Sequence, residues 1–310
     1  MDKNWPKSRR AELPESLLAE PFSVEDALDL GIAPSRLRAH DFHRPFRGVR
    51  SLVDTVDTHA LCHAYAPIMQ NGQLFSHLTA ARLYGFPLPQ RLQTSDRLDI
   101  WAESVQAKAE GVIGHRSASV PSGLVDGLPV VDPRYVLVQI ADVLGWDDLV
   151  MVGDFLVRRK WPLADVGGLN EVLRESRGVR GIRNLRLAMS DVRPGTDSPM
   201  ESKLRLVLIR GGLREPVIGH TITTPDGAFI GTPDLAYIPE RIAIEYEGDG
   251  HRTDRRVFVG DIERRELMQE QDWYVIRVVS AHLYPNPAWL INRVRQQLVL
   301  RAPGGPSNAL

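Results

Sequence analysis

Residues 229–247 read FIGTPDLAYIPERIAIEYE, and this stretch decides the fold of the C-terminal part of the chain. The segments on either side of Pro239-Glu240 are rich in Ile, Tyr, Phe and Thr, which favours β-strands. Pro239-Glu240 suits a two-residue turn, because proline fixes φ at the first central position. Counting outward from this turn places Asp234 directly opposite Glu245. The stretch therefore predicts a β-hairpin that brings two carboxylates together.

The hairpin carboxylates are expected to need a partner of opposite charge. Side chains alternate along a strand, so Glu245 and Glu247 share a face, and Asp234 lies opposite Glu245. Like charges placed opposite one another destabilise a sheet, and Glu245 follows an apolar run in which a carboxylate is costly. A hard divalent cation held by oxygen ligands removes this repulsion. The hairpin therefore predicts a metal site, and an ion pair between Glu245 and an arginine is the alternative.

Glu201 is the third carboxylate expected near the hairpin. Ser198-Pro199-Met200-Glu201 fits the start of a helix, with a capping serine and proline at the first helical position. Glu201, Leu204 and Leu208 lie on one face of that helix. If the two leucines pack on the sheet, Glu201 stands at the rim of the packed face and reaches the hairpin. The alternative interpretation is that Glu201 only caps its own helix.

Residues after the hairpin are further candidates for the same site. His251 follows Glu247 by four positions and would bind a metal or act as a general base. Asp261 and Arg265 lie four apart on the next expected helix, where they form either a surface pair or part of the site. Arg264 and Arg265 would hold phosphate. We expect Asp261 to point toward the site.

The amino-acid composition is typical of a globular protein. The 310 residues are 43% hydrophobic and 25% charged, with a net charge of −1, and this is enough apolar material for a sizeable core. The polar N-terminus and the lack of a run of 18 apolar residues predict no secretory signal and no membrane span. The single cysteine, Cys62, leaves no disulfide within the chain and no Cys-x-x-Cys zinc site. We therefore expect a cytoplasmic location.

The pattern of elements predicts an α/β protein of the α+β kind with three parts. Residues 1–56 are expected to form a winged helix-turn-helix module, residues 57–190 a mixed α/β region, and residues 191–310 a mixed sheet flanked by helices. The expected linker is residues 191–197, DVRPGTD, which are rich in Pro, Gly and Asp.

The first part carries the expected DNA-binding helix. Ser23 caps a helix that ends at Gly31, and a second helix is expected over Arg36–Phe42 after a short turn. In such a module the second helix enters the major groove. The candidate base-contacting residues are then Ser35, Arg36, Arg38 and His40. A plain protein-interaction module is the alternative.

The middle part contains dispersed histidines and a basic cluster. His59, His63, His77 and His115 are spread too widely for a metal motif, and we interpret them as structural. The basic cluster would contact phosphate or form solvated helix faces. It consists of Arg158, Arg159, Lys160, Arg174, Arg177, Arg180, Arg183 and Arg186.

The C-terminal pattern resembles the restriction-endonuclease fold of the PD-(D/E)xK type, and more narrowly a family of domains related to the very-short-patch-repair endonuclease. The resemblance covers residues 197–300, about a third of the chain. The matching motifs are Ser198-Pro199-Met200-Glu201, Pro233-Asp234-Leu235-Ala236-Tyr237, Ile244-Glu245-Tyr246-Glu247-Gly248, His251, Asp261-Ile262-Glu263-Arg264-Arg265 and Trp273-Tyr274-Val275-Ile276-Arg277-Val278.

This resemblance implies hydrolysis of phosphodiester bonds with Mg²⁺ or Mn²⁺. Asp234 and Glu245 would hold the metal, and Glu201 would bind it directly or through water. The backbone carbonyl of Tyr246 would be a further ligand.

The sequence departs from the family pattern at one position. Endonucleases of this fold commonly carry a lysine two positions after the strand glutamate, and here that residue is Glu247. The mismatch-repair branch of the fold also lacks this lysine and relies on a nearby histidine. By that resemblance His251 would act as the base, and Arg264 or Arg265 would bind phosphate.

The N-terminal part is similar to the winged-helix domain of abortive-infection antitoxins. The similarity rests on Ser23–Leu30, Arg36–His40 and Phe46-Arg47-Gly48-Val49, and it continues in the run Ser76–Pro89.

Together these patterns predict a Mg²⁺-dependent DNA endonuclease with an N-terminal DNA-binding module, acting in phage defence or DNA repair. The alternative is a non-catalytic, antitoxin-like DNA-binding regulator that keeps the nuclease fold as a scaffold and binds an operator through Arg36 and Arg38. RNA would serve equally well as the substrate, and nothing in the sequence separates the two. The expected partners are DNA, a second copy of the chain and, in the antitoxin interpretation, a toxin.

Overall fold

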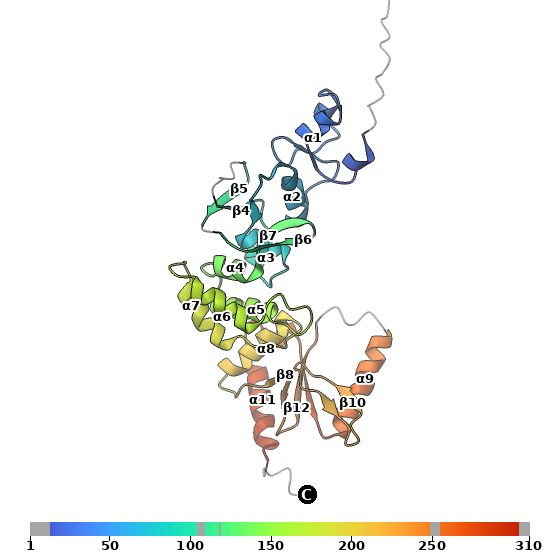
Figure 1. Ribbon diagram of the computed structural model, residues 1–310. Coiled ribbons are helices and arrows are strands. Elements are labelled where there is room, and N and C mark those ends of the chain that lie inside the picture. Colours follow the sequence, from blue (N-terminus) through green and yellow to red (C-terminus); the bar gives the residue numbers. More distant parts are fainter. Residues whose placement is uncertain (1–12, 104–108, 118, 249–254, 304–310) are drawn as a thin grey trace, which may run out of the picture. The chain divides into compact units, whose positions relative to one another are not determined.

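The computed structural model describes residues 13–103, 109–117, 119–248 and 255–303 (Figure 1). It contains helices and mixed sheets, so the α+β class predicted from the sequence is confirmed. In this described part of the chain, no helix is both long enough and apolar enough to cross a membrane.

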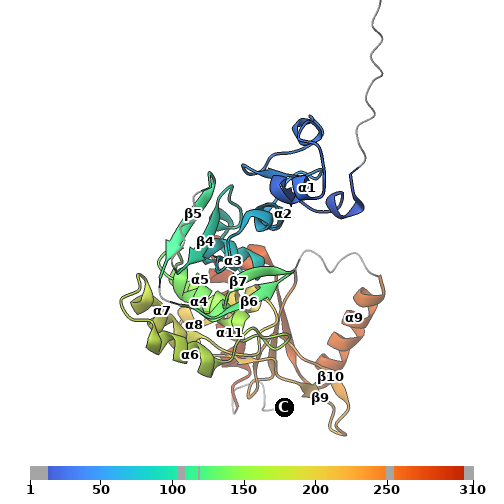
Figure 2. The same cartoon turned by 45° about the horizontal axis from the view of Figure 1, so that its top comes forward.

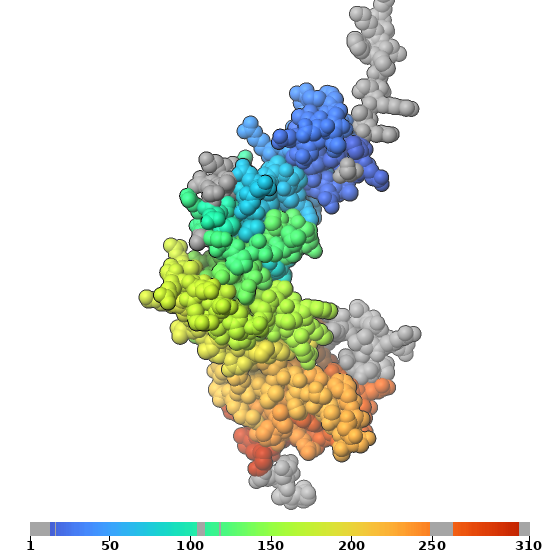
Figure 3. Space-filling view, viewed as in Figure 1, coloured from blue at the N-terminus to red at the C-terminus, as the bar shows by residue number. Residues whose placement is uncertain are grey.

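The chain divides into two compact units, which differ from the predicted boundaries at residues 56 and 190. Unit 1 comprises residues 1–144 and 171–182, and unit 2 comprises residues 145–170 and 183–310. The reason is that α5 (Trp146–Leu156), which precedes the expected linker, packs against α8 (Pro199–Arg210). In the space-filling view the yellow and orange residues of unit 2 lie directly against one another (Figure 3).

The beginning of unit 1 contains one of the two expected N-terminal helices. α1 (Val24–Asp29) begins after Ser23, whose Oγ accepts the backbone N–H of Asp26 at 2.9 Å, so the predicted cap is confirmed. β1 (Phe22–Ser23) pairs antiparallel with β2 (Val49–Arg50). A small apolar core holds these elements together, formed by Leu13, Leu17, Phe22, Ala27, Leu37 and Phe42.

The prediction of a second helix over Arg36–Phe42 is wrong. The structure has only a short 3-10 turn at Arg36–Arg38. The Arg36 guanidinium donates to both carboxylate oxygens of Asp41 at 3.0 Å and lies 4.5 Å above the Phe42 ring. A helix brings residues three and four apart onto one face, not residues five apart, so this ion pair requires a non-helical path. The described part of this segment therefore contains no recognition helix.

A five-stranded mixed sheet forms the centre of unit 1. Its order is β5 (Val112–Arg116), β4 (Leu98–Ala102), β3 (Leu74–Phe75), β7 (Leu128–Val131) and β6 (Ser122–Val125). The helices around it are α2 (Thr58–Tyr65), α3 (His77–Leu83) and α4 (Pro133–Gln139). Two further helices, α6 (Val166–Glu175) and α7 (Ile182–Ala188), lie where the chain passes between the units.

The sheet of unit 2 has the register predicted from the Pro239-Glu240 turn. β11 (Leu235–Tyr237) pairs antiparallel with β12 (Ile242–Tyr246), with Leu235 opposite Ile244. One position further out, Asp234 therefore lies opposite Glu245. The sheet order is β13 (Tyr274–Val278), β12, β11 and β8 (Val217–Ile218), with β12 and β13 parallel. β9 (Ile222–Thr223) and β10 (Phe229–Gly231) form a separate pair.

The two faces of this sheet are covered by different helices (Figures 1 and 2). On one face, Leu235, Ile244 and Ile276 pack with α8 and α11 (Ala288–Leu300). On the other face, Ala236, Ala243 and Val275 pack with the β9–β10 pair and with Met268 of α9 (Arg255–Glu270). Because side chains alternate, Asp234, Glu245 and Arg277 belong to the α9 face. α10 (Ser280–Leu283) connects β13 to the region before α11.

A buried ion network fixes α8. The side chain of Arg205 is 0% exposed, and its Nη2 lies 3.0 Å from Asp154 Oδ2 and 2.6 Å from the carbonyl of Asp191. Its Nη1 donates to Glu215 Oε1 at 2.9 Å. Three segments of unit 2 are therefore joined through one guanidinium.

Replacing Arg205 with alanine is expected to destabilise the protein by about 3–5 kcal/mol, because the buried carboxylate of Asp154 would lose its counter-charge. Arg210→Ala on the same helix is the control, since that side chain is 50% exposed in its pair with Asp147, and we expect a loss below about 1 kcal/mol. Urea unfolding followed by circular dichroism measures both. Equal losses in the two variants would contradict the assigned role of Arg205.

Candidate functional site

Three carboxylates meet at one end of the unit 2 sheet. Asp234 immediately precedes β11, Glu245 is in β12, and Glu201 lies in the first turn of α8. Glu201 is 8% exposed and Glu245 is 7% exposed. The backbone N–H of Tyr246 donates to Asp234 Oδ2 at 2.7 Å, which holds the Asp234 carboxylate against β12. The elements expected from the sequence therefore bring Glu201 and Glu245 within electrostatic reach of Asp234.

The charges of the three carboxylates act on one another. The pKa of Asp234 is raised from 3.8 to about 7, mainly by burial and then by the negative charge of Glu201. Glu245 raises it further, whereas the Tyr246 N–H and the Arg264 guanidinium oppose the shift. Burial also raises the pKa of Glu201. The end of the sheet is thus a place of crowded negative charge, of the kind found at functional sites.

Glu201 fulfils both interpretations suggested by its sequence context. Its backbone N–H donates to Ser198 Oγ at 3.2 Å, and its Oε2 accepts the backbone N–H of Asp197 at 2.8 Å. These bonds cap α8 and fix the carboxylate of Glu201. At the same time the charge of Glu201 reaches Asp234. The capping hydrogen bonds therefore hold the Glu201 carboxylate in place without removing it from the neighbourhood of Asp234.

Glu245 also forms an ion pair with an arginine, which the sequence suggested as the alternative to a metal site. Arg264 of α9 places its Nη2 3.2 Å from Glu245 Oε1. The close approach of α9 depends on Gly231 in β10, where a Cβ would lie 2.7 Å from Met268 Cε and 2.8 Å from Arg264 Cδ. A larger residue at position 231 would force the side chains of Met268 and Arg264 to shift.

Glu247, two positions after Glu245, is paired with an arginine. Both oxygens of Glu247 accept hydrogen bonds from the Arg277 guanidinium of β13. The backbone N–H of Glu247 donates to the carbonyl of Val278 at 2.7 Å, so the parallel pairing of β12 and β13 continues to this residue. Glu247 therefore faces a cation supplied by the next strand.

A basic loop lies beside the carboxylates, although the sequence pattern does not connect the two. Arg159 forms an ion pair with Asp197, and its positive charge also acts on Glu201 and Asp234. Gly219, with φ +60°, lies close to this side chain, and a Cβ there would be 3.3 Å from Arg159 Nη1. The next residues of the loop, Lys160 and Trp161, are exposed, Trp161 by 83%. The basic cluster was visible in the sequence, but its proximity to a site about forty residues later was not.

The remaining predicted site residues are placed as follows. His251 lies outside the described residues, and so does the side chain of Asp261. Arg265 is in α9 and is half-buried. Arg36 and Arg38 belong to unit 1, and Arg36 is engaged with Asp41.

The donor atoms suit a hard cation bound through few protein ligands. Within the described ranges, no group of three or more His, Cys, Asp or Glu side chains is placed closely enough to enclose a metal ion. Mg²⁺, however, is usually bound through one or two carboxylates, with water and substrate phosphate completing its coordination. Asp234 and Glu245 supply two such carboxylates, and the raised pKa of Asp234 indicates that added positive charge would be favourable there.

Comparison with known proteins gives relatives whose names state no activity. No family model matches the chain. "Uncharacterized protein MT2308" and "Uncharacterized protein Rv2248", from two strains of Mycobacterium tuberculosis, are each 25% identical over 221 residues, which is 71% of this chain and 79% of theirs. The crystal structure of RV2827C protein from Mycobacterium tuberculosis has a TM-score of 0.37 and 17% identity, over 67% of this chain and 84% of that one. The function therefore has to be inferred from the residues of the site.

We expect Asp234→Asn to stabilise the protein at neutral pH. Because the folded-state pKa of Asp234, about 7, lies above its ordinary value of 3.8, the folded protein binds this proton more tightly than the unfolded chain does. Stability is therefore lost as the pH rises from about 4 to about 7. Asparagine removes this loss and keeps an oxygen for the Tyr246 N–H, so the variant should be roughly 2–4 kcal/mol more stable at pH 7.5 and similar to the wild type near pH 4.

Urea unfolding across this pH range measures the effect. Glu266→Gln is the control, since Glu266 is an exposed carboxylate on α9, and its effect should stay within about 0.5 kcal/mol. An Asp234→Asn variant less stable than the wild type at pH 7.5 would show that the Asp234 charge is well accommodated in the fold.

Proposed function

We propose that unit 2 is a metal-dependent endonuclease domain that hydrolyses phosphodiester bonds in DNA. The observation that carries the proposal is the convergence of Glu201, Asp234 and Glu245 at the end of the sheet, with the pKa of Asp234 raised to about 7. The spacing of these residues also resembles the restriction-endonuclease pattern. Carboxylates that are buried together lower stability, so their presence at one point favours a role in binding or catalysis.

The residues divide into groups with different tasks. Asp234 and Glu245 would hold Mg²⁺ or Mn²⁺, which when bound supplies an activated water and offsets negative charge at the scissile phosphate. Glu201, fixed by the Asp197 N–H, orients water beside Asp234. Arg264 balances Glu245 in the absence of substrate and contacts phosphate when substrate is present.

The loop that contains Arg158, Arg159, Lys160 and Trp161 supports a nucleic-acid substrate. Arg159 and Lys160 lie near the carboxylates, since both approach Asp197, Lys160 at 3.7 Å. Arginine and lysine bind the phosphate backbone, and an exposed tryptophan provides a surface on which a base stacks. Such contacts serve DNA and RNA alike, and we propose DNA because of the family resemblance. A nucleic-acid substrate and a single cysteine fit a cytoplasmic protein.

Cleavage of supercoiled plasmid tests the proposal. With Mg²⁺ or Mn²⁺ the full chain is expected to nick or linearise the plasmid. Asp234→Asn and Glu245→Gln should each lower the rate by roughly 100-fold or more, because each removes a metal-binding carboxylate. Glu266→Gln should cleave like the wild type.

Two outcomes would contradict the nuclease proposal. One is equal cleavage by the wild type and Asp234→Asn at matched purity, which would identify a contaminating nuclease. The other is the absence of cleavage of plasmid and of single-stranded RNA with both metals. The second outcome would favour a non-catalytic DNA-binding regulator.

A non-catalytic DNA-binding regulator is the second candidate, and two ion pairs favour it. Arg264 is paired with Glu245, and Arg277 is paired with Glu247 at the position where the family carries a lysine. Each carboxylate then has a structural counter-charge, which would let the fold persist as a scaffold. In this case plasmid cleavage is absent, whereas the full chain still retards a DNA fragment that carries its operator.

A further inference from the structure

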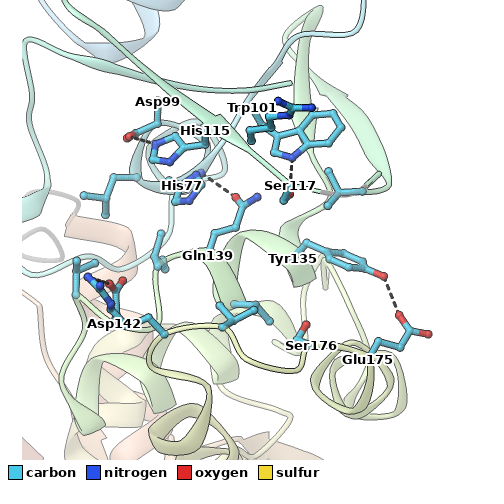
Figure 4. A pocket seen from close by; sticks show the side chains of 18 of the residues that line it. His77, Asp99, Trp101, His115, Ser117, Tyr135, Gln139, Asp142, Glu175 and Ser176 are labelled. Atoms are coloured by element: carbon cyan, nitrogen blue, oxygen red, sulfur yellow. Dashed lines mark hydrogen bonds and ion pairs between the residues drawn. The ribbon is translucent and has the colours of Figure 1, made fainter. Parts of the chain in front are cut away.

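Unit 1 contains a cavity of about 770 Å³ that the carboxylate site does not involve (Figure 4). Its wall includes residues of β4, β5, α3 and α4, and it is completed by the segment from Glu175 to Arg180. Apolar residues such as Val138, Ile140 and Val179 form much of this wall. A cavity of this size, mainly apolar and with a few polar groups directed into it, is typical of a small-molecule site.

Two aromatic side chains of the cavity are held by hydrogen bonds. Trp101 Nε1 donates to Ser117 Oγ at 2.7 Å, and the Tyr135 hydroxyl donates to Glu175 Oε2 at 2.9 Å. Figure 4 shows Trp101 above the cavity and Tyr135 below it. Their rings are therefore fixed before a ligand arrives, which lowers the entropic cost of stacking a flat molecule against them.

A pair of stacked histidines forms the other side of the cavity. The rings of His77 and His115 are 3.5 Å apart and inclined by 19°, and His115 Nε2 lies 2.8 Å from Asp99 Oδ1. The two histidines lie far apart in the sequence, yet β5 and α3 bring their rings together. Burial and the neighbouring His115 lower the pKa of His77 to about 4, so its ring is neutral at physiological pH. Its Nδ1 is hydrogen-bonded to Ser76 Oγ at 3.0 Å, which leaves Nε2 as the ring nitrogen for a ligand.

Gln139 presents a hydrogen-bond donor between these walls. Its Oε1 accepts the backbone N–H of His77 at 2.9 Å. Because a backbone N–H can only donate, the oxygen of the amide is assigned and Nε2 is the group left to bind a ligand. His77 has φ +47°, an unfavourable conformation for a residue other than glycine, and this bond holds it there.

The mouth of the cavity carries cations. Arg116, Arg177 and Arg180 all contribute to the lining and are exposed. Asp142 lies 4.0 Å from Arg180 and balances part of this charge. Arginine binds phosphate and carboxylate groups in a bidentate manner, so the mouth suits one anionic group on a ligand whose flat part lies inside.

We propose that this cavity binds a free nucleoside monophosphate: a planar heteroaromatic base against Trp101 and Tyr135, its ring edge on Gln139 and His77, and its phosphate on the arginines of the mouth. The volume accommodates such a molecule. The base has both donors and acceptors on its edge, which matches the mixed donors and acceptors of the wall. Binding would give unit 1 a ligand of its own, independent of whether unit 2 cleaves nucleic acid.

Calorimetric titration of the full chain with AMP, GMP, CMP and UMP tests this inference. At least one nucleotide is expected to bind at one site with a dissociation constant below about 100 μM, and adenosine or inorganic phosphate should bind about tenfold or more weakly. Gln139→Glu keeps the acceptor for the His77 N–H but replaces the donor with a negative oxygen, so it should weaken binding by about tenfold or more. Arg177→Ala at the exposed mouth should weaken it as well.

Trp289→Ala is the control, because this partly exposed tryptophan belongs to unit 2. Circular dichroism of each variant confirms that it is folded. The inference is overturned if none of the four nucleotides binds below about 1 mM. It is also overturned if inorganic phosphate binds as tightly as the nucleotides, or if folded Gln139→Glu and Arg177→Ala both retain the wild-type affinity.

Discussion

The buried guanidinium of Arg205 is the interaction on which the arrangement of unit 2 depends. It binds Asp154 of α5, the carbonyl of Asp191 and Glu215 at the same time. α8 is thereby fixed against α5 and against the segment that precedes α8. Because Glu201 lies in the first turn of α8, the same network determines that its carboxylate faces Asp234 at the end of the sheet.

The site combines a well-packed scaffold with electrostatic repulsion. Leucine and isoleucine side chains on one face of the sheet pack against α8 and α11. The other face, which packs against α9, carries acidic residues at one end of the sheet. Arg264 and Arg159 reduce the repulsion, but the pKa of Asp234 remains at about 7. Natural proteins retain such local conflicts where function requires them. A cation at this point would remove the conflict, and this is the physical basis of the proposed metal site.

Local patterns predicted a large part of this fold and site. The Pro239-Glu240 turn defines the register of the two strands, so the sequence predicted that Asp234 lies opposite Glu245. Ser198 predicted the start of the helix that carries Glu201. Contacts between segments distant in the sequence could not be derived this way. Arg264, Arg277 and Arg159 are ordinary surface cations in a pattern, and only tertiary packing assigns each to its carboxylate. The prediction of a recognition helix was wrong. Arg36 instead pairs with Asp41, and residues five apart do not share a helix face.

We propose that Asp234 belongs to a cluster of interacting carboxylates that takes up a divalent cation. A carbon-13 NMR titration of the aspartate and glutamate side-chain carboxyls measures this directly, in wild type and Glu201→Gln, with and without Mg²⁺. We expect an Asp234 pKa of about 7 in the wild type, a lower value in Glu201→Gln, and a downward shift on addition of Mg²⁺. An Asp234 carboxyl that titrates near its ordinary value of 3.8 and responds neither to the substitution nor to Mg²⁺ would contradict this proposal.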